Sequence, residues 1–347
     1  MGRRRPVRLA GISLAAMVLA TVTVACGGEP ETAVGPSPSP VKTGAEAASP
    51  ARSRTPQATV SLPPEAKFEA AEGRFAVYRM YRQVRRFVEE ARAQPQRDRW
   101  ELYRPLVVEP MDEFVRYLEP DWERRWAAWV RTVDIEGLEH TVSLMAEAEV
   151  DGIAGRALEE IAAALGPYAW PQRPVFLLAG QWPYDPGNFY GHANIAGAVT
   201  IFLYAAPGED PREFWRTNLP ALVAHEAHHS VREALGKVAL TLIGQIVFEG
   251  LADAFAEELY GSPATHVQLD KETERRLWAQ IQESAFSTDQ NLIDRYLQGS
   301  QGVPPRTAHY FGYKIVQAYK ASHTGTTAAS LVGASEFDIY AESGYEP

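Results

Sequence analysis

The first aromatic residue of the 347-residue chain is Phe68, although aromatic residues make up 10% of the whole sequence. A folded domain of ordinary composition distributes its aromatic side chains through its core, so a core cannot form in the residues before Phe68. The folded part must therefore lie between about residue 65 and the C-terminus. That stretch is long enough to bury a substantial core.

Residues 1–25 have the pattern of a secretory signal. They hold four arginines and no acidic residue, and end in 17 uncharged residues, too few for a comfortable membrane span. The segment closes with Val22-Thr23-Val24-Ala25-Cys26-Gly27, which resembles a bacterial lipobox in which Thr23 stands where Leu is usual. The resemblance implies that Cys26 is lipidated and anchors an extracytoplasmic protein to the bacterial cell membrane. The alternative is a plain secretory signal with Cys26 at the cleavage site by chance.

The segment that follows, residues 26–64, is predicted to be a disordered tether. Eight prolines lie in residues 27–64 among small polar residues, a composition that cannot pack. Removal of the four signal arginines changes the formal net charge from −10 to −14, which makes nucleic acid an improbable partner. No cysteine follows Cys26, so a metal site in the folded part must use His and carboxylate ligands.

The folded part is predicted to be mainly helical around a small sheet, an α+β fold. Apolar residues recur at intervals of three, four and seven from Phe68 to Val88, and this predicts a helix that begins near Pro64. Further helical patterns make residues 65–170 a helical N-terminal region; these patterns cover 98–118, 121–132 and 154–165.

The sheet is predicted at the start of a second region, 171–347. Residues 174–179 and 198–204 have the composition of buried strands, and 187–194 between them have that of a loop. After Pro220 the pattern is helical to about residue 332. The strand Val199–Tyr204 is the expected sheet edge that would align an extended peptide, with His192 and Asn194 in the cleft.

The stretch His225-Glu226-Ala227-His228-His229 contains the pattern His-Glu-x-x-His. On an α-helix, residues four apart lie on one face, so His225 and His229 can bind one zinc ion while Glu226 reaches its water. Asn218 as N-cap and Pro220 in the first turn predict that this helix begins just before the motif.

A second helix is predicted to complete the site. Glu249 follows His229 by twenty residues, beyond a turn around Gly236, and Asp253 lies one helical turn later. Catalytic zinc sites commonly use two His and one Glu, which makes Glu249 the expected third ligand. Asp253 would accept the second N–H of a ligating imidazole. A solvated helix face is the alternative, but the residues around both acids are apolar.

His228 leaves a second pairing open. It lies three residues after His225 and also flanks the ligand face, so a pair of His225 with His228 is an alternative to the pair of His225 with His229. The position of Glu226 favours the second pair. His228 is then expected to be a neighbouring polar contact.

With Glu249 and Asp253 included, the site resembles the thermolysin-type gluzincin metallopeptidases. A closer resemblance, over about residues 170–347, is to a bacterial family of predicted Zn-dependent proteases, the YjaZ-like domain. Its matching segments are Val223-Ala224-His225-Glu226 to His229, Arg232, Thr241-Leu242-Ile243, Glu249-Gly250-Leu251-Ala252-Asp253 and the late helix Tyr310-Phe311-Gly312-Tyr313. The resemblance implies a zincin-like fold in 171–347 and a peptide or protein substrate.

The resemblance and the residues indicate the same chemistry, peptide-bond hydrolysis with Glu226 as the general base. Gluzincins supply an oxyanion donor from the C-terminal half, and the candidates here are Tyr313, Tyr310 and His309, of which Tyr313 is preferred. Two other functions remain open. One is a non-catalytic zinc-containing lipoprotein that binds a peptide or partner, and the other is a zinc hydrolase of a non-peptide amide or ester.

Overall fold

The computed structural model describes residues 67–111, 115, 118, 122–166, 172–181, 189–193, 197–205, 210–263 and 267–347. The predicted signal, the tether and Cys26 lie outside the described residues, as does Asn194. The described chain is mostly helical with a small mixed sheet, as expected for the α+β class. No helix among these residues combines the length and the apolar character that crossing a membrane requires.

The sheet has five strands in the order β1-β2-β3-β5-β4. Their bounds are β1 Lys67–Ala70, β2 Phe75–Tyr78, β3 Arg173–Ala179, β4 Phe189–Ala193 and β5 Val199–Leu203. β2, β3 and β5 are parallel, and the two outer strands β1 and β4 run antiparallel to their neighbours. The hairpin β1–β2 therefore joins the same sheet as strands that come about a hundred residues later.

A helix prediction and a loop prediction were wrong. Residues 67–78 form the hairpin β1–β2 instead of the first turns of a helix, and residues 189–193 form β4 instead of a loop. Val199–Tyr204 is also not the sheet edge, because β5 pairs with β3 on one side and with β4 on the other. The outer strand on that side is β4, which pairs with β5 along its whole length.

A group of helices lies between β2 and β3 along the chain. They are α1 Met80–Ala93, α2 Arg99–Tyr103, the π-helical turn Arg104–Val108, the 3₁₀ turn Glu109–Met111, α4 Trp122–Thr132, α5 Ile135–Glu147 and α6 Val150–Leu165. α4 contributes to the core through Trp126, which is buried and packs on Tyr103 and on Phe202 of β5. The helical interpretations of 121–132 and 154–165 are confirmed.

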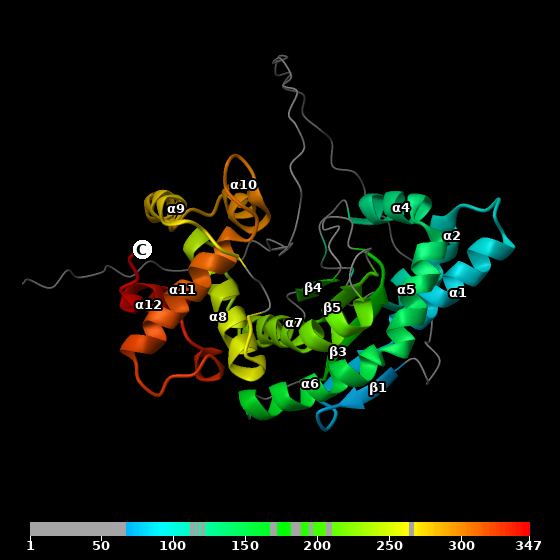
Figure 1. The fold of residues 1–347 in the computed structure, drawn as a ribbon, viewed down its shortest axis with the longest axis horizontal. Coiled ribbons are helices and arrows are strands. Elements are labelled where there is room, and N and C mark those ends of the chain that lie inside the picture. The colour runs from blue at the N-terminus through cyan, green and yellow to red at the C-terminus, as the bar shows by residue number, and fades with distance from the viewer. Residues whose placement is uncertain are drawn as a thin grey trace, which may run out of the picture.

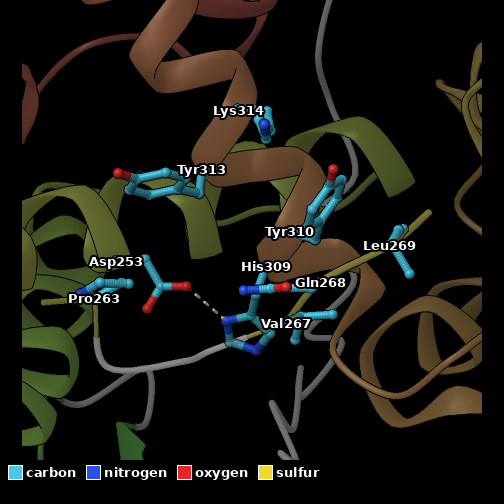
Figure 2. Close-up of a pocket in the computed structure, with 9 residues that line it drawn as sticks. All are labelled: Asp253, Pro263, Val267, Gln268, Leu269, His309, Tyr310, Tyr313 and Lys314. Carbon is cyan, nitrogen blue, oxygen red and sulfur yellow. Dashed lines mark ion pairs between the residues drawn. The ribbon is translucent and has the colours of Figure 1, made fainter. Parts of the chain in front are cut away.

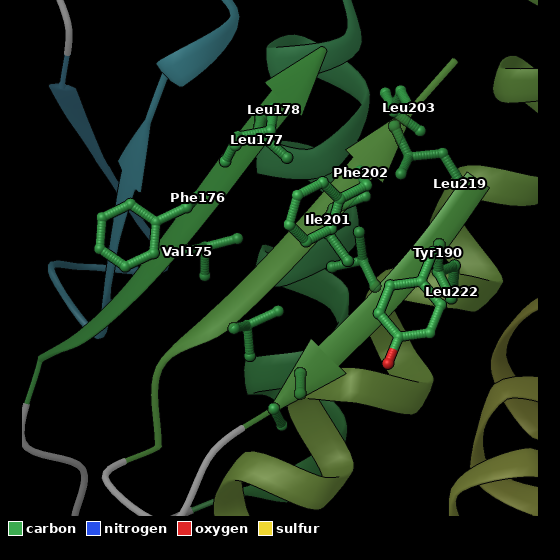
Figure 3. Packing of buried hydrophobic residues seen from close by; sticks show 14 of the residues in the cluster. Val175, Phe176, Leu177, Leu178, Tyr190, Ile201, Phe202, Leu203, Leu219 and Leu222 are labelled. Atoms are coloured by element: carbon green, nitrogen blue, oxygen red, sulfur yellow. The ribbon is translucent and has the colours of Figure 1, made fainter. Parts of the chain in front are cut away.

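Two long helices follow the sheet and connect the two ends of the molecule (Figure 1). They are α7 Pro211–Ala234 and α8 Leu242–Tyr260. After them come α9 Lys271–Ser284, α10 Gln290–Asp294, the π-helical turn Arg295–Gly299, α11 Thr307–Ser322, the 3₁₀ turn Ala329–Leu331 and α12 Glu336–Ser343. α7 packs on β4, β5 and α6, α8 packs on α7, and α11 packs on α8. The sheet core extends to α7 through Leu219 and Leu222 (Figure 3).

The helix that carries the histidine motif begins earlier than predicted. Asp210 is its N-cap, accepting a hydrogen bond from the backbone N–H of Arg212, and Pro211 is its first residue. Asn218 and Pro220 lie inside the helix, where the Asn218 side chain donates to the carbonyl of Phe214. The cap prediction was wrong because Asp210 and Pro211 already supply the N-cap side chain and the first-turn proline, eight and nine residues before Asn218 and Pro220.

Candidate metal centre

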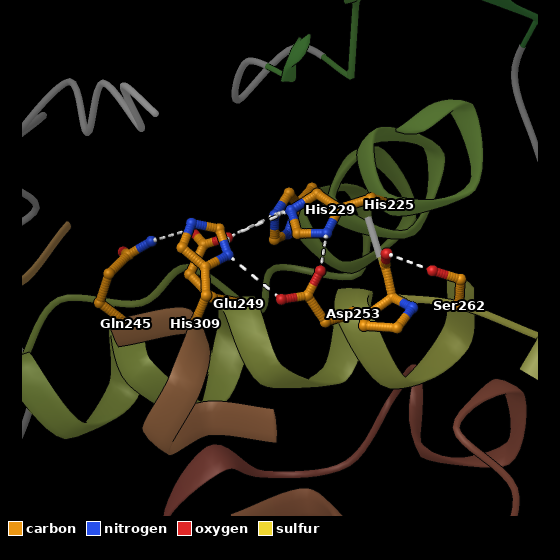
Figure 4. Close-up of polar contacts among 8 residues, drawn as sticks. His225, His229, Gln245, Glu249, Asp253, Ser262 and His309 are labelled. Carbon is orange, nitrogen blue, oxygen red and sulfur yellow. Dashed lines mark hydrogen bonds and ion pairs between the residues drawn. The ribbon is translucent and has the colours of Figure 1, made fainter. Parts of the chain in front are cut away.

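The metal centre is built on α7 and α8, two neighbouring helices joined by a short loop. α7 ends near Leu235, and Gly236 follows with a φ of +72°, a left-handed conformation that lets the chain turn back. Thr241 caps α8 by accepting a hydrogen bond from the N–H of Gly244. The histidine face of α7 is thereby brought against the carboxylate face of α8 (Figure 4).

Three donor atoms converge between these helices. His225 Nε2 lies 3.2 Å from Glu249 Oε2, His229 Nε2 lies 3.1 Å from the same oxygen, and the two imidazole nitrogens are 2.9 Å apart. All three side chains are buried, and Glu249 is 0% exposed. A tetrahedral zinc ion with Zn–N and Zn–O bonds of about 2.0–2.1 Å spaces its ligands about 3.3 Å apart. The triangle formed by these atoms fits that ion.

A third histidine approaches the same carboxylate from α11. His309 Nδ1 lies 3.4 Å from Glu249 Oε2 and 3.4 Å from Asp253 Oδ2, and its ring centre lies 5.6 Å from that of His225. His225, Glu249 and His309 offer ligand atoms that all lie within 4.8 Å of one another. The described residues therefore contain two overlapping candidate triads, which share His225 and Glu249.

Carboxylates on α8 hold the histidines in place. Asp253 Oδ1 lies 3.0 Å from His225 Nδ1, the contact expected from the sequence, and Gln245 donates to Glu249 Oε1 at 2.9 Å. Burial works to lower the pKa of His225, but Asp253 and Glu249 raise it well above its usual value. Burial lowers the pKa of His229 to about 4, so this imidazole is neutral and able to bind a metal at neutral pH.

The Glu226 side chain packs closely against the backbone of β4. It accepts a hydrogen bond from the backbone N–H of Ala193, and a Cβ added to Gly191 would lie 2.4 Å from the Glu226 Cγ. Only glycine leaves room for the carboxylate at this position of the strand. Burial, reinforced by the Glu249 carboxylate, raises the pKa of Glu226 to about 8, against the opposing effect of His225. β4 thus places the expected general base beside the cluster.

The structure separates the remaining candidates. His228 is buried against Phe255 with ring centres 5.3 Å apart, and does not join either triad. Tyr313 donates its hydroxyl to Glu257 at 2.6 Å, and Tyr310 donates its hydroxyl to Glu274 at 2.9 Å. Of the three expected oxyanion donors, only His309 places a polar side-chain atom, Nδ1, beside the candidate ligand Glu249. His192 lies in β4 and is buried.

Two contacts at the cluster were missed from the sequence. Gln245 lies one helical turn before Glu249, a spacing that could have indicated it. Phe248 stacks on the His229 ring, with centres 4.2 Å apart and planes 8° from parallel. The guanidinium of Arg232, one turn after His229, lies 5.8 Å from the centre of the same Phe248 ring. A phenylalanine beside a ligand in an apolar helix carries no sequence signal that separates it from ordinary core.

This part of the chain has known relatives. Residues 169–339 match the model of a family described as "Predicted Zn-dependent protease (DUF2268)". That description names a zinc-dependent protease for the family. A relative from Bacillus subtilis (strain 168), "Uncharacterized protein YjfC", is 26% identical over 154 residues, which are 39% of this chain and 49% of the relative. The chain thus spans about half the length of the curated relative that it matches. No solved structure matches.

The family description and the buried cluster together identify zinc as the cofactor. The matched residues include α7, α8 and α11, which carry every histidine and carboxylate of the cluster. The hairpin β1–β2 and α1 to α6 lie before the matched stretch.

Proposed function

We propose that the protein is a zinc metallopeptidase of the gluzincin type with a zincin-like fold, in which His225, His229 and Glu249 hold the zinc ion. The observation that carries the proposal is the triangle of three buried donor atoms, 2.9–3.2 Å apart. Two histidines and one glutamate leave a fourth coordination position for water or substrate, as catalytic zinc sites require.

His229 is preferred to His309 as the third ligand for two reasons. Its Nε2 is closer to Glu249 Oε2, at 3.1 Å compared with 3.4 Å for His309 Nδ1. It also lies four residues after His225 on the same helix, so the backbone holds both imidazoles on one face. His309 then remains to act on the substrate.

Glu226 is the proposed general base. Zinc in such a site polarises the scissile carbonyl and lowers the pKa of water to about 7. Glu226 would take a proton from the attacking water and give it to the leaving amine. Burial raises the pKa of Glu226 to about 8, so this carboxylate takes up a proton readily. A cation bound nearby would lower that pKa and favour the ionised form, which is the form that accepts a proton from water.

His309 is the proposed oxyanion donor in place of Tyr313. The imidazole lies against Glu249 and Asp253 on the α11 side of the cluster, where a donor can reach the oxygen of a tetrahedral intermediate. The Tyr313 hydroxyl would first have to leave Glu257.

The proposed substrate is a peptide or protein segment in extended conformation, aligned along β4. β4 is the outer strand of the sheet on that side, and its Ala193 N–H already meets Glu226. A peptide added to this edge would pass the general base.

Glu226→Gln tests the function directly. The variant should keep one zinc ion per chain and lose about 10²- to 10⁴-fold in kcat on a peptide substrate, because the amide cannot accept the proton. Zinc is measured by atomic spectroscopy and cleavage by mass spectrometry. The matched control is Glu213→Gln, an exposed substitution on the same helix, which should cleave at the wild-type rate. Cleavage by Glu226→Gln at that rate contradicts the mechanism.

Phe248→Leu should weaken zinc binding by about 10- to 100-fold, the effect expected when a group that orients a metal ligand is lost. His229 Nδ1 is buried and has no hydrogen-bond partner among the described residues, so no hydrogen bond orients that side of the ring and the Phe248 stack supports it instead. Phe255→Leu is the control, since Phe255 lies on the same helix against His228. Chelator competition gives both affinities, and equal losses in the two variants argue against the orienting role.

We also propose that the enzyme works outside the cytoplasm, lipid-anchored to the bacterial cell membrane through Cys26. The lipobox-like sequence supports this location. Cys26→Ala should move the protein from the membrane fraction to the soluble fraction of expressing cells, as followed by immunoblot. Retention in the membrane fraction would exclude the anchor.

A further inference from the structure

Five large apolar side chains are exposed among the described residues, and all of them lie on three segments near the end of α7. The segments are the loop between α7 and α8, the loop after α9 and the start of α12. These five residues form the apolar patch: Leu235, Val238, Leu240, Phe286 and Phe337. Phe286 is 67% exposed and Leu240 is 56% exposed. Single exposed apolar residues are ordinary, whereas a cluster of them marks an interaction surface.

Hydrogen bonds and a ring contact hold the three segments together. The first two residues of α8 donate backbone hydrogen bonds to the carbonyls that flank Phe286, both at 2.9 Å. The Phe286 and Phe337 rings lie with their centres 5.9 Å apart. Near the end of α7, Arg232 pairs with Glu336, the residue before Phe337. The patch is therefore one surface built from neighbouring segments.

The patch is small for an interface between two protein chains. Its exposed fractions correspond to roughly 400–500 Å² of surface, because a fully exposed side chain of this size presents about 150–250 Å². A standard protein interface buries about 800 Å² on each partner. A second copy of the chain docked on this patch alone would bury about half of that area, which is too little for a stable dimer.

The anchor proposed for Cys26 supplies an apolar partner within reach. Residues 27–66 span roughly 35 Å as a flexible coil and at most about 140 Å when extended, so the folded part stays close to the bilayer. Beside the patch, Lys237 is balanced by the exposed Asp289 and Asp338, which disfavours a strongly anionic partner. Because the tether keeps the bilayer at a high effective concentration, a small apolar patch is sufficient for binding.

We propose that the apolar patch docks reversibly on the lipid bilayer to which Cys26 anchors the chain. The proposal rests on that anchor and adds the face of the folded part that meets the membrane. Insertion of the exposed Phe and Leu side chains among the lipid headgroups removes apolar surface from water. Without the anchor the same contact is weak, so the release expected for Cys26→Ala is unchanged.

The apolar patch is close to the metal centre but separate from the pocket beside it. His229 lies six residues before Leu235, about 9 Å along the axis of α7. The pocket, of about 400 Å³, lies between α8, α11 and the segment before α9, and is lined by other residues, Asp253 and His309 among them (Figure 2). Docking would therefore hold the metal centre near the membrane surface through residues that do not line its pocket.

A fluorophore on the anchored protein tests the contact. Cys26 is the single cysteine of the chain and lipidation occupies its thiol, so an introduced cysteine is the one that takes a thiol-reactive fluorophore. Leu240→Cys labels the patch, and Ala93→Cys, the matched control, labels the exposed end of α1, at the other end of the molecule from α9 and α12 (Figure 1). In phosphatidylcholine vesicles that contain a spin-labelled lipid, the fluorophore in the patch should be quenched at least about twofold more strongly than the control. Equal quenching of the two would overturn the proposal.

Two further substitutions assign the excess quenching to the patch. Phe286→Ser, added to Leu240→Cys, should reduce the excess to about half or less, because the most exposed side chain of the patch is lost. Gln282→Ser, an exposed substitution four residues earlier on α9, should preserve it. Excess quenching that is the same in both variants would overturn the proposal.

Failure of the anchor is detected separately. The wild-type protein takes up the fluorophore only if the Cys26 thiol is free, which would refute the lipid anchor. The patch is then tested by flotation of the chain from residue 26, carrying Cys26→Ala, with phosphatidylcholine vesicles, where Phe286→Ser should lower the partition coefficient about tenfold. No vesicle binding, or a dimer in gel filtration that Phe286→Ser dissociates, would overturn the proposal. Neither measurement involves peptide cleavage, so both hold whether or not the peptidase function does.

Discussion

Glu249→Ala should reduce the zinc content of the purified protein from one ion per chain to almost none, and abolish peptide cleavage with it. Glu249 Oε2 is the atom that both His225 Nε2 and His229 Nε2 approach, at 3.2 and 3.1 Å. A structural zinc site is worth about 10–16 kcal/mol in all, so losing one ligand costs on the order of 10³-fold in affinity. Zinc content and chelator competition measure the effect.

The controls for this prediction lie on α8 and α11. Glu257→Gln, two helical turns along α8, keeps an acceptor for Tyr313 and should retain one zinc ion per chain. His309→Ala should also retain zinc while kcat falls, if His309 acts on the substrate as proposed. Loss of zinc in His309→Ala, with retention in His229→Ala, would replace His229 by His309 in the ligand set.

The parts of the site that the sequence could predict are those set by spacing within a helix. His225 and His229 lie on one face because they are four residues apart, and Glu249 and Asp253 share a face for the same reason. The helices α7 and α8 are consecutive and joined by a short loop, so the two faces meet with little choice of arrangement. The spacing within each helix was therefore sufficient to predict that these four residues lie close together. Their roles as ligands and support stay predictions until zinc is measured.

The hairpin β1–β2 was mistaken for a helix because its signal is not local. Intervals of seven and three among Phe68, Phe75 and Tyr78 suit one face of a helix, yet Phe75 and Val77 alternate in a strand whose first three residues are buried. What decides between the two is β3, whose Arg173 pairs with Phe75. A partner about a hundred residues away cannot be found from the periodicity of the segment itself.

His309 could not be ranked above Tyr313 for the same reason. Both lie on α11, and the choice between them depends on which face of α11 turns to α8. That face is set by Gly250 and Gly312, which allow the two helix backbones to touch. A glycine inside each of two apolar helices is the signal that could have indicated this crossing.

Gly312→Ala should destabilise the protein by about 3 kcal/mol or more and disturb the metal centre at the same time. An alanine Cβ at this position would lie 1.9 Å from the backbone oxygen of Ile246 and 2.7 Å from the backbone nitrogen of Gly250. Backbone atoms inside a packed helix cannot move aside as a side-chain end can, so α11 must shift away from α8. His309 lies one turn before Gly312 and would move away from Glu249 with it.

Gly152→Ala is the matched control, since Gly152 also lies inside a helix. A Cβ there would meet only Arg156 Nη1 at 3.5 Å and Glu149 Cβ at 4.0 Å, which are ordinary contacts. Without a clash, the substitution should stabilise the protein by up to about 1 kcal/mol, because alanine has less backbone freedom to lose on folding. Urea denaturation of both variants measures the difference. A Gly312→Ala protein as stable as Gly152→Ala, with unchanged kcat, would mean that the contact between α8 and α11 does not position His309.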